Sequence, residues 1–296
     1  MQRRERGRLE TNLARAPLWE SGARPDPAPF DGRSLLGPFA CTTRLGPLDL
    51  KVLAYVIDRF CWPPPESDSD PAKFSIYDLV AAIYGREPSG RDRQQLRAAL
   101  VRLFRVEVHL VGFDASTGRR DANVTTRGRL LQEIVDEYRK LGPEPDPREV
   151  GALRGSTFKV YLGRWLAQQA RAGYVTYLDF RIMRRLSGLS ERLWVYLEAE
   201  NWGRPAREGR VTRWVALGPD MYEVLGMHYA RGCDARKALR RAGERIVRAD
   251  ARYDAVTVGE RAGGRGGSWI LRATRITDAE RRKVRDAIFE SLSRTA

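Results

Sequence analysis

The segment 234–276 constrains the fold of this 296-residue chain more than any other part of its sequence. Small and apolar residues recur at helical spacing over 235–249, which predicts a helix with one face toward a core. Apolar and polar residues then alternate over 253–258 and 269–272, and this period of two predicts strands. The glycine-rich residues 259–268 between them predict a turn. The order helix, strand, turn, strand is typical of a winged helix, whose helix enters the major groove of DNA while its hairpin touches the backbone.

The face of this helix opposite the apolar stripe is predicted to bind DNA. Only Glu244 lies at a spacing that could neutralise its cations, so most of the charge has no partner within the helix. A solvated surface is the alternative interpretation, but an uncompensated basic face repels itself and is better explained by an anionic partner. Asp234 is predicted to cap the helix, with Gly232 and Cys233 in the preceding loop. The predicted DNA-binding residues are Arg236, Lys237, Arg240, Arg241, Arg245 and Arg248 on the helix, and Arg261 and Arg265 in the wing.

The charge of the whole chain also favours a polyanionic partner. Its formal net charge is +15, and nucleic acid is the most common partner of so basic a protein. A membrane is not an expected partner, because no apolar run approaches the ~20 residues of a spanning helix. The first residues lack the apolar core of a secretory signal, so we expect a cytoplasmic protein. Cys41, Cys61 and Cys233 are odd in number and widely separated, which fits reduced thiols.

The first half of the chain predicts the same order of elements. An apolar helical stripe covers 50–61, and a second helix is predicted between a capping Ser75 and a terminating Gly85. A basic helix over 91–104 follows, and then a hairpin whose first strand is 105–113. Its predicted DNA-binding residues are Arg91, Arg93 and Arg97.

The two halves can be aligned by their apolar positions. Leu96, Ala99 and Leu103 of the first basic helix recur as Leu239, Ala242 and Ile246, at an offset of about 143 residues. Similar offsets align the two preceding helices of each half, so an internal duplication is predicted.

We therefore predict an α+β protein with tandem winged-helix domains, each made of a helix-turn-helix and a β-hairpin wing. Residues 1–44 are rich in arginine, proline and glycine and are predicted to form a disordered basic tail. The first winged-helix domain is assigned to 45–152 and the second to 153–277, because prolines and glycines mark 141–155 as a linker. Residues 278–296 predict a C-terminal amphipathic helix that packs on the body.

The run 174–202 resembles a signature of plasmid replication initiator proteins, in which a serine that starts a helix is followed by arginine, leucine and an aromatic residue. Here Ser187 or Ser190 would be the serine, and Arg192 the arginine. Trp194 stands where a tyrosine is usual.

This resemblance implies two winged helices over residues 45–276 that bind repeated DNA sites at an origin. It also implies that Arg192 is mainly structural and that the second basic helix makes the principal base contacts. The first domain would share its surface with dimerisation.

Signals for catalysis are weak. His109 and His228 have no partner at the spacing of a metal site or triad, and no His-x-His pair supports a nicking enzyme. The glycines of 263–267 lack the lysine and threonine of a P-loop, so we interpret them as a wing turn, with a short RNA-contacting element as the alternative.

The sequence therefore predicts a non-enzymatic protein without metal or cofactor. The predicted function is a plasmid replication initiator that binds repeated double-stranded DNA sites, or iterons, and promotes origin opening. The expected partners are double-stranded DNA, a second copy bound through the first domain, and host replication proteins such as initiator and helicase. A winged-helix transcriptional repressor and a pairing protein that uses one winged helix for dimerisation are the alternatives.

Overall fold

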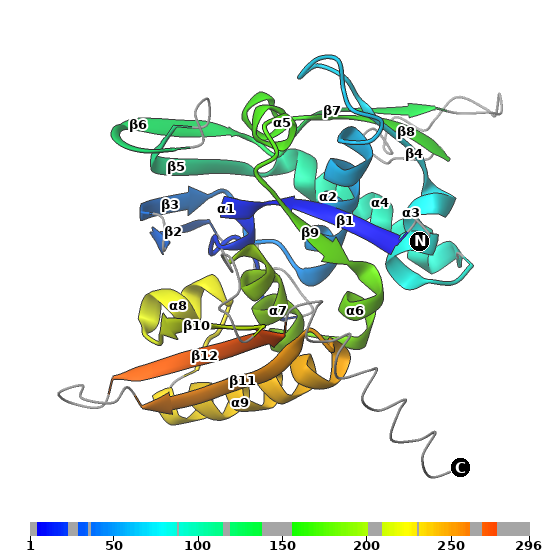
Figure 1. Cartoon of the computed structure of the whole chain (residues 1–296). Coiled ribbons are helices and arrows are strands. Elements are labelled where there is room, and N and C mark those ends of the chain that lie inside the picture. The colour runs from blue at the N-terminus through cyan, green and yellow to red at the C-terminus, as the bar shows by residue number, and fades with distance from the viewer. Residues whose placement is uncertain are drawn as a thin grey trace, which may run out of the picture.

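The structure is a mixed α/β arrangement of small antiparallel sheets and helices around one continuous apolar cluster (Figure 1). It is a computed structural model. It describes residues 5–22, 29–34, 37–87, 89–114, 119–137, 156–200, 209–229, 231–260 and 268–276.

The part of the molecule that we name the C-terminal unit consists of three helices and a three-stranded sheet. The strand order is β10-β12-β11, so the last strand lies between the other two. The elements are α7 (Leu189–Ala199), β10 (Arg210–Ala216), α8 (Pro219–Val224), α9 (Gly232–Ala249), β11 (Tyr253–Glu260) and β12 (Trp269–Ile276). The predicted helix and hairpin are confirmed, whereas β10 had no counterpart in the sequence interpretation.

Helix α9 packs closely on β11. Its predicted apolar stripe is confirmed, because Leu239 and Ile246 are fully buried. Gly243 allows the close approach, since a Cβ atom there would lie 2.3 Å from the backbone oxygen of Val256. The predicted start of the helix is wrong: α9 already begins at Gly232, its N-cap is Arg231, and no side chain caps it. Asp234 lies in the first turn instead, where its negative charge is favourable to the helix dipole.

The first half of the chain contains a second unit with the same strand order, which we name the N-terminal unit. Its sheet has the order β4-β8-β7, again with the last strand in the middle. The elements are α2 (Pro47–Phe60), β4 (Ala72–Ser75), α3 (Ile76–Tyr84), α4 (Gly90–Arg105), β7 (Leu131–Glu137) and β8 (Thr157–Leu162). The aligned positions are buried in both basic helices: Leu96, Ala99 and Leu103 in α4, and Leu239, Ala242 and Ile246 in α9.

The predicted boundary between the domains at 152/153 is wrong. Strand β7 pairs with β8 across 141–155, as Val135 does with Lys159, so both strands belong to one sheet. The proline- and glycine-rich segment therefore connects neighbouring strands rather than domains. Local composition identified a connection, but only the pairing shows what it connects.

The hairpin predicted after the first basic helix is present, but it belongs to a different sheet. Its strands β5 (Glu107–Asp114) and β6 (Arg119–Arg129) join β2 (Phe30–Ser34) and β3 (Gly37–Cys41) in the order β2-β3-β5-β6. In the N-terminal unit, the two strands that follow the basic helix α4 and pair with each other in its sheet are β7 and β8.

The prediction of a disordered tail over 1–44 is wrong for the part of that range that the structure describes. Strand β1 (Arg6–Glu10) pairs with β9 (Val175–Asp179), and the short helix α1 (Thr11–Ala14) follows it. Leu9, Leu13 and Trp19 are almost completely buried. The sequence predicts a tail here because the segment contains few apolar residues. Those in its described part mostly enter the core, and its partner strand β9 is distant in sequence.

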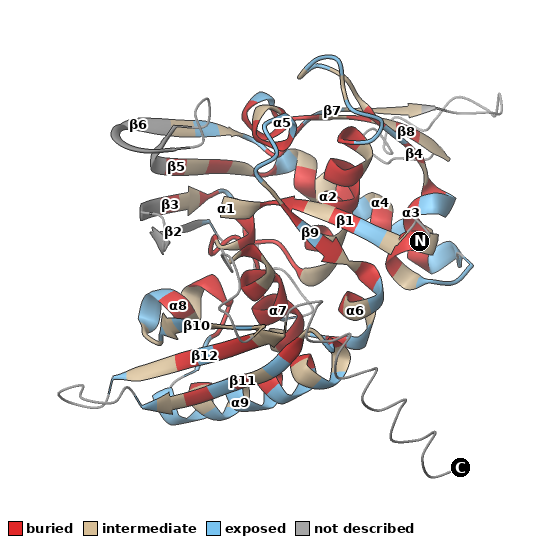
Figure 2. Cartoon of the chain, viewed as in Figure 1, coloured by how far each residue is buried: buried red, intermediate tan, exposed pale blue. Residues whose placement is uncertain are grey.

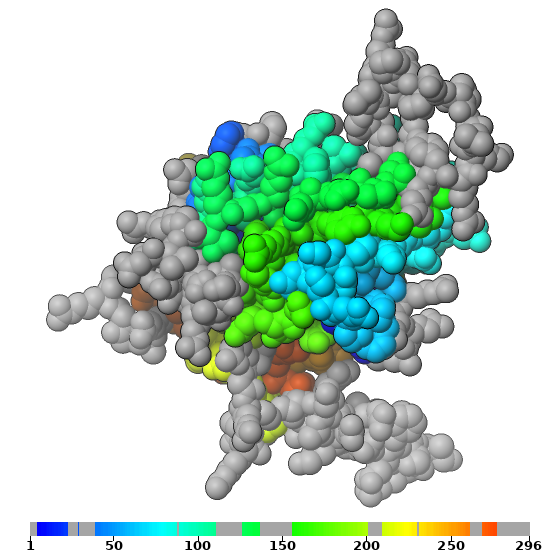
Figure 3. Space-filling view, turned by 90° about the horizontal axis from the view of Figure 1, so that it is seen from above, coloured from blue at the N-terminus to red at the C-terminus, as the bar shows by residue number. Residues whose placement is uncertain are grey.

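The N-terminal segment (residues 5–22) lies between the two units, together with β9 and α6 (Phe180–Arg185), whereas α5 (Arg164–Arg171) lies at the top of the view beside β6 and β7 (Figure 1). Buried residues continue from α2 through β1 to α7 (Figure 2). Seen from above, segments coloured cyan to green, which belong to the first two thirds of the chain, cover most of the described surface, and little of the C-terminal unit is visible (Figure 3). The predicted C-terminal helix at 278–296 lies outside the described residues. Within the described residues, no helix is long and apolar enough to cross a membrane.

Candidate nucleic-acid interface

The outer face of α9 carries most of the cations predicted to bind DNA. Because the buried stripe packs on the sheet, the opposite face points to solvent (Figure 2). Arg236 is partly buried. The remaining five cations of the predicted set are exposed: Lys237, Arg240, Arg241, Arg245 and Arg248.

The positive charge of this face is not neutralised by the described parts of the chain. No ion pair among the described residues involves Lys237, Arg241, Arg245 or Arg248, and Glu244 is also unpaired there. Two other acids of the C-terminal unit are paired with an arginine outside α9. Arg252 lies 2.6 Å from Asp250 and 3.0 Å from Glu198, so these two carboxylates do not reach the α9 face.

Helix α7 fixes α9 from the buried side. The indole nitrogen of Trp194 donates a 2.9 Å hydrogen bond to Asp250, the C-cap residue of α9. Trp194 is fully buried. The aromatic residue of the initiator-like signature thus holds the end of the basic helix.

Arg192, the arginine of the same signature, is structural as expected. It is 3% exposed and donates from Nε to the Val224 oxygen at 3.0 Å. Its other two nitrogens donate to the oxygens of Ala14 at 2.5 Å and Ala16 at 2.9 Å. Burial lowers the pKa of Arg192 to about 9, so the side chain remains charged at neutral pH. It joins α7, the end of α8 and the N-terminal segment.

Sequence reasoning missed the role of Trp269, the first residue of β12. The guanidinium carbon of Arg236 lies 4.1 Å from the centroid of its ring, and that of Arg240 lies 5.8 Å away. A tryptophan directly after the glycine-rich turn was the available signal. The predicted wing residues Arg261 and Arg265 lie outside the described residues, but the turn leaves the sheet at the paired residues Glu260 and Trp269.

Helix α4 presents less free charge than α9. Arg91 is exposed and has no ion pair among the described residues, and Arg97 is partly buried. Arg93 donates to the hydroxyl of Tyr77 at 3.2 Å and stacks on its ring.

Acids also neutralise cations on and near α4. Arg102 binds Asp49 at 2.7 Å, and Arg86 lies 2.7 Å from Asp92 in the first turn of the helix. Hydrogen bonds from Ser89, with a smaller contribution from Arg86, lower the pKa of Asp92 to about 2, so a negative charge persists at this end of α4.

The two histidines have different neighbours in the described structure. Nε2 of His228 lies 3.0 Å from Glu20, which also binds Arg44 at 2.6 Å, so this cluster joins the C-terminal unit to the N-terminal segment. His109 lies within β5, opposite Arg127 of β6. In the described ranges, no three His, Cys, Asp or Glu side chains are grouped so that they could hold a metal ion.

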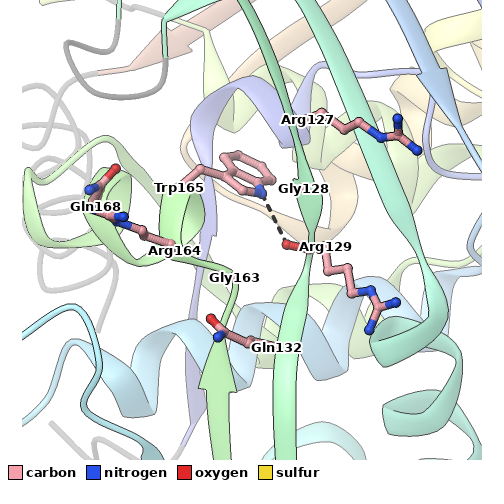
Figure 4. A pocket seen from close by; sticks show the side chains of 8 residues that line it. All are labelled: Arg127, Gly128, Arg129, Gln132, Gly163, Arg164, Trp165 and Gln168. Carbon is pink, nitrogen blue, oxygen red and sulfur yellow. Dashed lines mark hydrogen bonds between the residues drawn. The ribbon is translucent and has the colours of Figure 1, made fainter.

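Three arginines border a pocket of about 400 Å³ between β6 and α5. Its lining residues are Arg127, Gly128, Arg129, Gln132, Gly163, Arg164, Trp165 and Gln168. The indole of Trp165 donates to the backbone oxygen of Arg129 at 3.1 Å. Figure 4 shows the side chains of Arg127 and Arg129 pointing away from Trp165, with Arg164 on the other side. Their guanidinium groups do not converge, so this pocket is not an anion site.

The comparisons with known proteins give little further information. No known family matches the sequence, and no curated protein matches it. The chain is similar to a solved structure described as "Crystal structure of Pi initiator protein in complex with iteron DNA", with a TM-score of 0.45 and 10% sequence identity over 94% of this chain and 99% of that chain. A likeness of this size does not identify a family.

Proposed function

We propose that this chain is a cytoplasmic, non-enzymatic, double-stranded DNA-binding protein with two winged helices, and that it acts as a plasmid replication initiator at repeated origin sites. The observation that carries the proposal is the unneutralised basic face of α9, which is presented by a winged-helix arrangement of strands. An uncompensated cluster of this kind is the electrostatic footprint of nucleic-acid binding.

The geometry of the C-terminal unit suits the major groove. With 18 residues, α9 is about 27 Å long, and a single α-helix fits the width of the groove. Its cations extend from the second turn to the last, so contacts to phosphates on both sides of the groove are available. The hairpin of β11 and β12 beside it would bring the glycine-rich turn, with Arg261 and Arg265, to the backbone.

The initiator role is supported by the signature around Arg192 and Trp194. These residues, respectively, join the C-terminal unit to the N-terminal segment and anchor the end of α9. The N-terminal unit has the same strand order and a second basic helix, and we propose that it supplies a weaker DNA contact and the surface for a homodimer. Host replication proteins such as initiator and helicase would act on the opened origin.

DNA binding is tested by removing two exposed cations from α9. The double variant Arg241→Ala/Arg245→Ala should bind duplex DNA more weakly, and the slope of log affinity against log salt should fall by about 2, since each lost phosphate contact contributes about 0.9. The matched control is Arg164→Ala/Arg185→Ala, which removes the same charge from exposed residues of α5 and α6. An equal loss in both variants would show that net charge, and not the α9 face, binds DNA.

Initiation is distinguished from repression by origin function. The DNA flanking the gene should contain directly repeated sites, and the protein should make the adjacent duplex reactive to a single-strand-specific chemical probe. Binding without opening, at a single site within a promoter, would favour the repressor. Failure to bind duplex DNA, together with self-association through one unit, would favour the pairing protein.

A further inference from the structure

Trp269 occupies a distinctive place between the basic helix and the hairpin. It is the first residue of β12 and pairs with Glu260, at the point where the glycine-rich turn connects the strands. Its partly buried ring lies beside Arg236 and Arg240, which are one helical turn apart on α9. Trp269 therefore contacts two cations of the predicted DNA-binding face at once.

Stacking changes what an arginine can do at a DNA surface. A free arginine side chain loses about 2 kcal/mol of rotamer entropy when it is ordered, and this cost opposes any contact that needs one fixed geometry. A guanidinium that already lies against an indole has lost part of that freedom, while the N–H groups on its edge remain available. Bidentate recognition of guanine requires such a fixed, planar pair of donors.

The other cations of α9 differ in this respect. None of Lys237, Arg241 and Arg245 has a ring contact or an ion pair among the described residues. Cations without a fixed partner suit phosphates, which offer equivalent oxygens along the whole backbone and carry no sequence information. The face thus contains two arginines that stack on Trp269 beside cations that have no such contact among the described residues.

We infer that Trp269 is a positioning residue that holds Arg236 and Arg240 for base contacts. Sequence preference then depends on this stack, whereas the overall attraction to DNA depends on the cations that do not contact Trp269. This inference rests on the proposed DNA-binding function. The residues that determine specificity would then be Arg236 and Arg240, in the N-terminal half of α9.

The sheet itself provides a matched control. Trp214 of β10 is 58% exposed and carries the guanidinium of Arg272 at 4.9 Å from its ring centroid. Trp214 is paired with Arg272 in the sheet, so these two side chains lie on one face. Trp269 is two residues from the buried Leu271 on β12 and therefore lies on the same face as Leu271. Because side chains alternate along a strand, the two tryptophan–arginine stacks lie on opposite faces, and only that of Trp269 faces α9.

The test uses the full-length protein and two duplexes: one selected by the wild-type protein from a random pool, and a scrambled duplex of the same length. The ratio of the two affinities measures sequence preference, and the salt slope counts phosphate contacts. Trp269→Ala should lower the ratio about 3- to 30-fold without changing the salt slope, which is the range expected from loss of a cation–π contact. Trp269→Phe should retain most of the ratio, and Trp214→Ala should retain all of it.

A further variant, Arg236→Lys, keeps the charge but loses the planar stacked group. Because it leaves Trp269 in place, it provides the test if Trp269→Ala does not fold. It should also lower the ratio at constant slope. Two results would overturn the inference. One is an affinity ratio that is unchanged in both Trp269→Ala and Arg236→Lys. The other is a folded Trp269→Ala protein whose affinities for the selected and the scrambled duplex fall together, so that their ratio is unchanged. If the wild-type protein selects no preferred duplex at all, the proposed function fails rather than the role of Trp269.

Discussion

Replacing Arg192 with methionine tests how the C-terminal unit is held to the N-terminal segment. The variant removes three hydrogen bonds, of 3.0, 2.5 and 2.9 Å, and leaves three buried carbonyl oxygens without these donors. Each such group costs about 1–3 kcal/mol. Methionine also removes the several kcal/mol required to bury a cation, so we expect a net loss of about 2–4 kcal/mol in the free energy of unfolding. Arg192→Lys should lose less, because an ammonium group can still reach one or two of the oxygens.

The assay is urea denaturation of the full chain, with the free energy of unfolding extrapolated linearly to water. Arg185→Met is the control, because this exposed arginine has no ion pair among the described residues and its loss should change stability by less than about 0.5 kcal/mol. The folded Arg192→Met protein should bind DNA with an unchanged salt slope, since the side chain is buried. A variant as stable as the wild type would refute the structural role.

Three other perturbations test separate contacts. Burial, opposed by Lys51 at 2.9 Å, raises the pKa of Glu191 from 4.5 to about 7. The contribution of Glu191 to stability should therefore be greatest below pH 4.5 and be lost as the pH rises to about 7, and Glu191→Gln should remove a slope of up to about 1.4 kcal/mol per pH unit in denaturation series. Gly243→Ala should lower the thermal midpoint although alanine favours helices, because its Cβ would meet the Val256 oxygen; a raised midpoint would contradict the packing. A bulky maleimide should react with the exposed Cys233, since Cys41 and Cys61 are buried, and the label should block DNA binding. Equal labelling rates with and without bound duplex would contradict the placement of α9 against DNA.

The elements that the sequence predicted best are those whose signal is local. Helix α9 packs its own stripe against its own hairpin, so Leu239 and Ile246 carry the pattern without reference to distant residues. Strand β10 was missed because its half-exposed residues alternate weakly and include Arg210 and Arg213. Its assignment as a strand depends on pairing with β12, which a local pattern does not reveal.

The errors concern pairings between segments that are far apart in the chain. Arg6 pairs with Asp179, and the tail that contains it has too few apolar residues to predict a strand alone. The same holds for β7 and β8, which are separated by a segment with the composition of a linker. A strand whose partner is unknown has no detectable register, so its sequence is easily interpreted as a tail or a domain boundary.

The candidate site shows the same division. The cations of α9 were predictable because a basic face is defined by one helix alone, whereas the contact of Trp269 with Arg236 requires the register of a hairpin and its packing on that helix. Arg192 was assigned a structural role only by resemblance. Its three acceptors come from two other segments of the chain.

The difference between the two basic helices follows from where the acids of each unit lie. In the N-terminal unit, Asp49 pairs with Arg102 of α4, and Asp92 lies within that helix, so part of its positive charge is neutralised. In the C-terminal unit, the buried Asp250 is paired with Arg252 beyond the end of α9 and does not face its cations. An even spread of net charge over the chain would not make the two basic helices differ. The placement of these acids, however, leaves the positive electrostatic potential concentrated over α9. Under the proposed function, association with DNA should therefore begin at the C-terminal unit. Because one core joins the units, α4 should then approach the duplex at a separation set by the protein.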